Sequence, residues 1–341
     1  MIYKFKLRQS YLFFLAAAIF FSCKQGSKPD VSKIDLEIKI ERFDQDLYAG
    51  KNKPLIGTTS LLQKKYGIFY YDYINKVVGN GEIQGNEMLN LLYNDKAYSD
   101  LTKETDSVFN TLSVFEKELT QSFKYIRHYY PKVRIPRFIA YVSGFSYQNI
   151  MGEDYLGIGL DMFLGKNSKF YGAIVDSAPR YVSRRFSPEY VVPRTVETFV
   201  REELFPEPDG TRSLLAKMIH NGKILYYMDQ VLDESIADSI KIGYTDRQLR
   251  WCETYKKEIW GYFLENNLLY ETNLNKIQVF LGDGPFTPGV GVEKESAPKL
   301  GIWTGWQIVR SYMKNNPGTT LQSLMEETDP QVILNKARYK P

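Results

Sequence analysis

The first 23 residues impose the strongest constraint on this chain, because they have the layout of a secretory signal. Three basic side chains lie between residues 4 and 8, an almost purely apolar run covers residues 11–21, and Ser22 and Cys23 follow it. An apolar run of this length is too short to cross a bilayer as a helix. The pattern therefore predicts a signal peptide over residues 1–22 and a folded protein that works outside the cytoplasm.

The position of Cys23 predicts a lipid anchor. Bacterial lipoprotein processing cuts before a cysteine that follows a small residue at the end of such a run, after the thiol has been diacylated. A plain signal peptide with an incidental cysteine is the alternative. Residues 24–32 are polar with glycine and proline, so residues 23–33 are expected to form a lipidated tether. No acidic cluster follows Cys23, which favours attachment on the periplasmic side; the choice between inner and outer membrane stays open.

Charge and cysteine content exclude other classes of protein. The formal net charge is +4, and three basic residues leave with the signal, so the mature chain carries +1 and has no excess that points to nucleic acid. If Cys23 carries lipid, Cys252 has no disulfide partner. Cys252 is then expected to be a buried, small apolar residue.

The hydrophobic pattern predicts a single α+β domain over residues 34–341, mostly helical and with a small sheet. The expected order is a strand at residues 36–40, a helical part at about 58–130, a small sheet at about 134–165 with strands at 138–142 and 155–160, and a helical part at about 190–341.

One helix, at about residues 191–204, is similar to the metal-binding helix of zinc metallopeptidases. In that layout His-Glu-x-x-His places two ligands on one face of a helix, with the glutamate beside them as general base. Here Glu197 lies in the glutamate position, but Val196 and Val200 occupy the ligand positions, and Asn221 lies where a second helix would bring a third ligand. Valine cannot bind zinc. We therefore expect a zincin-like shell without the metal-ligand histidines, no metal and no cofactor.

Two carboxylates remain weak catalytic candidates. Glu197 is spaced to form an ordinary ion pair with Arg201 one turn later, on the surface side of its helix. Asp229 falls on the apolar stripe of the helix at residues 213–232, where a hydrogen-bonded or ion-paired structural role is the simpler interpretation. His220 is expected at the surface or rim of the same helix, and Gly222 lies where it would allow close helix approach.

A possible cleft is indicated by the segment at residues 298–310. Lys299, Trp303 and Trp306 stand there with two glycines, directly before and within a predicted helix. These side chains either line a ligand-binding cleft or fill a core beside a tight loop. With only His128 and His220 in the chain, no Ser-His-Asp arrangement is indicated.

Several segments together resemble the gliding-motility lipoprotein family of the Bacteroidetes, the GldB type. They are the end of the signal at Cys23, the sequence IERFD at residues 40–44, YLGIGLDMFLG at 155–165, MIHNGKILY at 218–226 and the segment at 301–313. The resemblance implies an envelope lipoprotein needed for gliding, a process tied to type IX secretion, and distant kinship to predicted zinc metallopeptidases.

Three hypotheses follow. The first is a catalytically inactive peptidase relative that binds other envelope motility or secretion proteins, whose identity the sequence does not indicate. The second is a peptide or glycan hydrolase that uses Glu197 or Asp229 without histidine. The third is a binding module with a cleft near Trp303 and Trp306.

Overall fold

The computed structural model describes residues 28–341 except residues 80, 84 and 293. The chain divides into two units, Met1–Lys33 and Ile34–Pro341, and the second contains all the helices and strands that the structure describes. Among the described residues, no helix is both long and apolar enough to span a bilayer. Cys23 lies outside the described residues.

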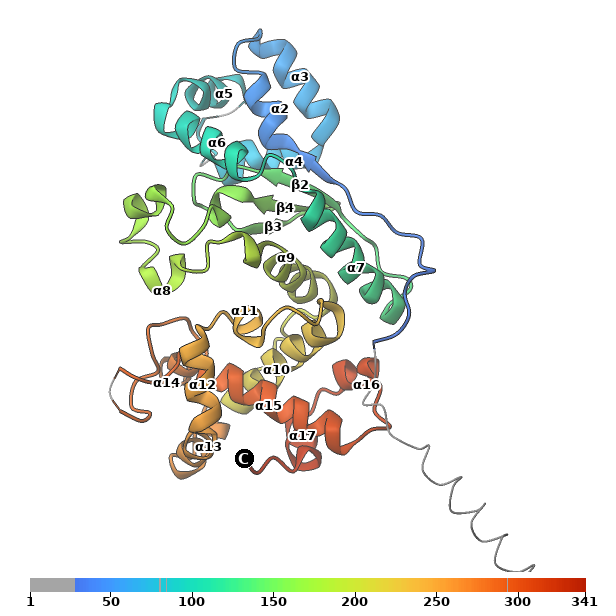
Figure 1. Ribbon diagram of the computed structural model, residues 1–341, viewed down its shortest axis with the longest axis vertical. Coiled ribbons are helices and arrows are strands. Elements are labelled where there is room, and N and C mark those ends of the chain that lie inside the picture. The colour runs from blue at the N-terminus through green and yellow to red at the C-terminus, as the bar shows by residue number, and fades with distance from the viewer. Residues whose placement is uncertain (1–27, 80, 84, 293) are drawn as a thin grey trace, which may run out of the picture. The chain divides into compact units, whose positions relative to one another are not determined.

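The unit Ile34–Pro341 is an α+β domain in which helices surround a small four-stranded sheet (Figure 1). The strands are β1 Ile40–Arg42, β2 Arg137–Tyr141, β3 Asn149–Met151 and β4 Tyr155–Gly159. The helices before the last three strands are α2 Phe43–Ala49, α3 Leu55–Tyr66, α4 Ile68–Asp72, α5 Gly85–Asn94, α6 Lys96–Val108 and α7 Ser113–Tyr129. Those after the sheet are α8 Arg180–Ser183, α9 Val191–Phe199, α10 Leu214–Val231, α11 Asp238–Ile242, α12 Asp246–Thr254, α13 Lys256–Glu265, α14 Leu274–Ile277, α15 Leu300–Asn315, α16 Leu321–Glu326 and α17 Pro330–Ala337. The predicted fold class is confirmed.

The sheet has the order β1-β2-β4-β3, with β1, β2 and β4 parallel and β3 antiparallel to β4. The first strand lies later than predicted, at Ile40–Arg42 instead of residues 36–40. The reason is that side chains of α7 accept hydrogen bonds from the backbone of residues 38 and 40, so these N–H groups do not pair with a strand. Ile38 N donates to Thr120 Oγ1 (2.9 Å) and Ile40 N to Glu116 Oε1 (3.0 Å). Strand β3 was not expected from the sequence.

Alternation along the strands gives the sheet two buried faces. Phe138 and Ala140 of β2 point into a core that contains α7 and α9, whereas Ile139 and Tyr141 point into a second core formed with α2–α5. In that second core the Phe43 ring packs edge-on against three other aromatic rings, with centroids 4.7–5.0 Å apart. Figure 1 shows the two groups of helices on opposite sides of the sheet.

The C-terminal helices assemble around α10 and α15, which touch at two glycines. Ser213 begins α10 as an N-cap, its hydroxyl accepting from Ala216 N. A Cβ on Gly222 of α10 would lie 2.4 Å from the carbonyl carbon of Gly305, and a Cβ on Gly305 would lie 1.9 Å from Met218 O. The expected close approach at Gly222 is therefore present. Cys252 of α12 is buried and forms no disulfide. This agrees with the prediction that it is a buried, small apolar residue.

Replacing Gly305 by alanine should strongly destabilise the fold, because the new methyl group meets backbone atoms that cannot turn aside. We expect Gly305→Ala to lower the free energy of unfolding by about 3 kcal/mol or more, the upper range of the overpacking penalty. Urea denaturation followed by tryptophan fluorescence measures this.

Gly57→Ala is the matched control. Gly57 lies in α3 with no atom within 4 Å of the added Cβ. The change should stabilise the protein by up to about 1 kcal/mol, since alanine favours helix. Equal stability of Gly305→Ala and the wild type would refute the glycine contact.

Candidate functional site

Glu197 lies on α9, three residues before Val200, where Val200–Leu204 continues the helix as a turn of π-helix. Its side chain is only 14% exposed, so Glu197 is more buried than the surface position that the sequence predicted. Arg201 Nε donates to Glu197 Oε1 at 2.8 Å, so the predicted pair is present, and Arg194 Nη1 donates to the other carboxylate oxygen. Two guanidinium groups therefore hold this one carboxylate.

Val196, Val200 and Asn221, which the sequence analysis compared with zinc ligands, all take part in contacts within the fold. Val196 and Val200 are fully buried in the core. Asn221 Oδ1 accepts from Arg201 Nη1 at 3.0 Å, so Arg201 bridges Glu197 on α9 and Asn221 on α10. In the part of the chain that the structure describes, no three His, Cys, Asp or Glu side chains are grouped so that they could hold a metal ion.

The electrostatics of Glu197 favour its ionised form. Burial opposes ionisation, but the charges of Arg194 and Arg201 outweigh it and lower the pKa of Glu197 to about 2. A general base works best when its pKa is near the operating pH. This carboxylate stays ionised and paired at neutral pH.

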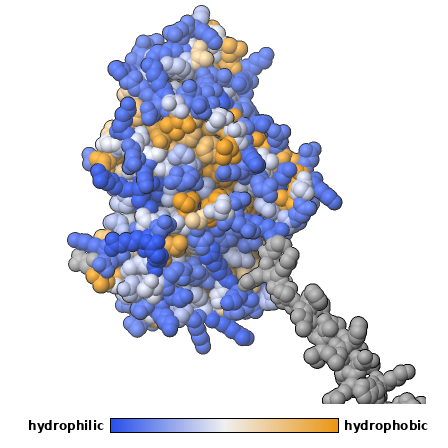
Figure 2. All heavy atoms as spheres, viewed as in Figure 1, coloured by the Kyte–Doolittle hydropathy of each residue, from blue (hydrophilic) through white to orange (hydrophobic). Residues whose placement is uncertain are grey.

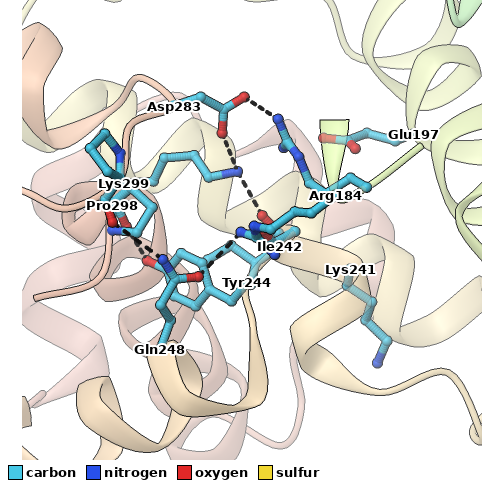
Figure 3. A network of polar contacts seen from close by, with 12 residues as sticks. Arg184, Glu197, Lys241, Ile242, Tyr244, Gln248, Asp283, Pro298 and Lys299 are labelled. Carbon is cyan, nitrogen blue, oxygen red and sulfur yellow. Dashed lines mark hydrogen bonds and ion pairs between the residues drawn. The ribbon is translucent and has the colours of Figure 1, made fainter. Parts of the chain in front are cut away.

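The cationic side chains near Glu197 also cap the C-terminal end of α11 (Figure 3). Four consecutive carbonyl groups there accept hydrogen bonds from three side chains that come from separate segments. The pairs are Arg194 Nη2 to Ile240 O (3.0 Å) and to Lys241 O, Lys299 Nζ to Ile242 O (2.6 Å), and Arg184 Nη2 to Gly243 O (2.8 Å). We call these four groups the α11 carbonyl cluster. The last carbonyls of a helix have no partner within the helix and carry partial negative charge, so cations stabilise them.

Asp283 completes this network from the loop between α14 and α15. Its carboxylate pairs with Arg185 Nη2 at 2.7 Å and with Lys299 Nζ at 3.1 Å. Burial opposes ionisation of Asp283, but Lys299 and Arg185 hold its pKa well below the usual range. Burial lowers the pKa of Lys299 to about 8, although Asp283 acts in the opposite direction. The carbonyl groups of α11 that accept from these cations had no signal in the sequence.

Asp229 lies in a second ion-pair group between α10 and α15. Its carboxylate accepts from Lys241 Nζ (2.8 Å), Trp306 Nε1 (3.0 Å) and Arg310 Nε (2.9 Å). The guanidinium of Arg310 also stacks on the Trp306 ring, 3.8 Å from the centroid. This arrangement is the structural role that the position of Asp229 on the apolar stripe indicated.

The three residues of the possible cleft are not brought together around an opening. Trp303 and Trp306 are fully buried in the core, and Lys299 is 8% exposed and bonded to Ile242 O and Asp283. Lys299 begins α15 with a positive φ of 52°. His220 is half-buried on α10, and burial lowers its pKa to about 4.

Glu197→Gln should destabilise the protein in a pH-dependent way. The pKa of Glu197 is lower in the folded protein than its ordinary value of 4.5, so its contribution is full above about pH 5 and disappears as the pH falls towards 2. We expect the variant to lose roughly 2–3 kcal/mol of unfolding free energy at pH 7 and progressively less below pH 4.5. Urea titrations from pH 7 to pH 3 measure this difference.

The exposed Glu258 of α13 supplies the control. Glu258→Gln should change stability by less than about 0.5 kcal/mol throughout, as surface substitutions do. If the loss caused by Glu197→Gln were the same at pH 7 and pH 3, the ion pairs would not be the source of the stabilisation.

Comparison with known proteins gives one family. No curated protein and no solved structure matches the chain significantly. The family model described as gliding motility protein GldB matches residues 24–341, which is all of the chain after Cys23. The chain therefore belongs to the GldB family of gliding motility proteins.

Proposed function

We propose that the protein is a lipid-anchored component of the gliding machinery in the cell envelope, and that it acts without catalysis by binding other motility or type IX secretion proteins. The observation that carries this proposal is the state of the two candidate carboxylates. Arg194 and Arg201 hold Glu197, while Lys241 and Arg310 hold Asp229. A carboxylate that is already ion-paired in a largely buried site is poorly placed to activate water or protonate a leaving group.

A hydrolase without histidine is less well supported. Carboxylate catalysis of glycoside cleavage needs one carboxyl group with a raised pKa and a second one at a defined separation from it. The pKa of Glu197 is lowered instead, by two arginines. Asp229 lies between α10 and α15, where it accepts hydrogen bonds from the Trp306 indole and from the cations Lys241 and Arg310.

A cleft-type binding module near Trp303 and Trp306 has less support as well, because both rings are buried. A partner would have to bind elsewhere on the surface. Recognition of other envelope proteins by surface contacts fits a domain whose two candidate carboxylates are ion-paired within the fold.

Lipid anchoring is proposed from Cys23 and the signal-like run before it. The family model begins at residue 24, directly after this cysteine. A single acyl chain binds membranes only marginally, whereas a cysteine that carries several chains gives a stable anchor. The proposed location is the envelope membrane, with the folded domain on the periplasmic side.

Glu197→Gln and Asp229→Asn should both leave gliding intact at matched protein levels, because neither carboxylate performs chemistry. Colony spreading and single-cell speed measure gliding, and immunoblotting measures the amount of protein. Cross-linking in intact cells should recover the same envelope proteins from both variants and from the wild type.

The catalytic alternative predicts a different set of results. Loss of gliding at normal protein level, together with peptide cleavage and stoichiometric zinc in the purified protein, would overturn the non-catalytic proposal.

Cys23→Ala should abolish lipid labelling, since it removes the only thiol at the processing site. Cells grown with a radiolabelled or alkyne fatty acid should label the wild type and leave the variant unlabelled, and the variant should be unprocessed or soluble. Cys252→Ala is the control, because its thiol is buried and should accept no lipid. Equal labelling of Cys23→Ala and the wild type would refute the anchor.

A further inference from the structure

Helix α3 exposes apolar side chains on the face that does not pack against the core. Thr58, Leu62 and Tyr66 are its buried residues. On the opposite face Ile56 is 75% and Leu61 is 66% exposed. Figure 2 shows apolar atoms at the surface over α3, among hydrophilic ones.

Lysine side chains surround these two apolar residues. Lys64 and Lys65 lie on the exposed face of α3, and Lys53 lies just before the helix. Lys53, Leu61, Lys64 and Lys65 are among the residues that line a hollow of about 440 Å³ between α2 and α3, and Asp46 of α2 lines it as well. We call Lys53, Ile56, Leu61, Lys64 and Lys65 the α3 surface.

The charge of this region differs in sign from that of the rest of the mature chain. Residues 45–71 contain four lysines and one aspartate, a net charge of +3, whereas the mature chain carries +1. The remainder therefore carries −2. Asp46 pairs with Lys65 and accepts from Tyr66 Oη (2.6 Å). Among the described residues, no carboxylate forms an ion pair with Lys53 or Lys64.

We propose that the α3 surface binds the headgroup region of an anionic lipid bilayer. Exposed branched apolar side chains can enter the acyl boundary of a bilayer, and lysines beside them can contact anionic headgroups. The proposal rests on the lipid anchoring in the proposed function, which holds the domain beside a membrane. It adds a second contact, which restricts how the domain faces the bilayer.

Vesicle co-sedimentation tests this with the chain from residue 24, which lacks Cys23 but keeps the whole unit Ile34–Pro341 with both cores. Vesicles of phosphatidylcholine alone are compared with vesicles that contain 30% phosphatidylglycerol. We expect binding to the anionic vesicles only, weakened by 0.5 M salt. Lys53→Glu with Lys64→Glu should reduce the affinity at least about 25-fold, because each basic residue near the surface contributes about fivefold. Leu61→Ser should reduce it as well.

The matched controls carry the same changes elsewhere. Lys257→Glu with Lys340→Glu, and Leu274→Ser at a residue that is 61% exposed, should leave vesicle binding within twofold of the wild type. Thermal unfolding confirms that each variant is folded.

Three results would overturn the proposal: no binding to anionic vesicles, equal binding to both kinds of vesicle, or equal losses in the α3 variants and the controls. Absence of vesicle binding together with α3-dependent capture of an acidic envelope protein would assign the surface to that protein instead. Lipid labelling at Cys23 is measured separately, so failure here leaves the anchor itself intact.

Discussion

The contact between Gly222 and Gly305 sets the geometry on which the C-terminal part of the domain depends. Because neither residue has a side chain, α10 and α15 approach until backbone meets backbone. Residues of α15 then come within hydrogen-bonding distance of α10, and Trp306 and Arg310 reach Asp229. A larger residue at either glycine would separate the helices and take Trp306 and Arg310 away from the largely buried carboxylate of Asp229. Such a loss costs more than the hydrogen bonds themselves contribute, since the group would stay desolvated.

The α11 carbonyl cluster joins three segments that are distant in the sequence. Arg184 precedes α9, Arg194 lies within it, and Lys299 begins α15, yet all three donate to the end of one short helix. Arg185 and Arg201 bring the number of cations in this region to five. In the described part of the chain, Arg194 and Arg201 pair with Glu197, and Arg185 and Lys299 pair with Asp283. Backbone carbonyls with their partial negative charge supply the remaining stabilisation. The conformation of α11 is therefore coupled to the positions of both α9 and α15.

The fold class and the close helix contact could be predicted, because hydrophobic periodicity and a glycine on an apolar stripe are local signals. The shift of the first strand could not, since it depends on Thr120 and Glu116, about 80 residues away, taking backbone N–H groups. The same limit applies to the candidate site. The Glu197–Arg201 pair could be predicted from spacing along a helix. The contact of Arg194 Nη1 with the same carboxylate could not, because Arg194 is also held by a hydrogen bond from its Nη2 to a carbonyl group of α11. The burial of Trp303 and Trp306 was one of two interpretations, and only three-dimensional packing separates them.

The position of Glu197 between two buried valines has a physical explanation that needs no catalysis. In a peptidase-like layout the glutamate works beside a cation held by histidines, and its negative charge is balanced there. Here Val196 and Val200 extend the apolar core, and the guanidinium groups of Arg194 and Arg201 supply the balancing positive charge. Arg201 also reaches Asn221. Arginine suits this position because its planar fork can donate to two acceptors while it stays charged. Through these two arginines the carboxylate of Glu197 on α9 is connected to Asn221 on α10 and to the carbonyl groups of α11. Removing it would leave two guanidinium groups without their carboxylate partner.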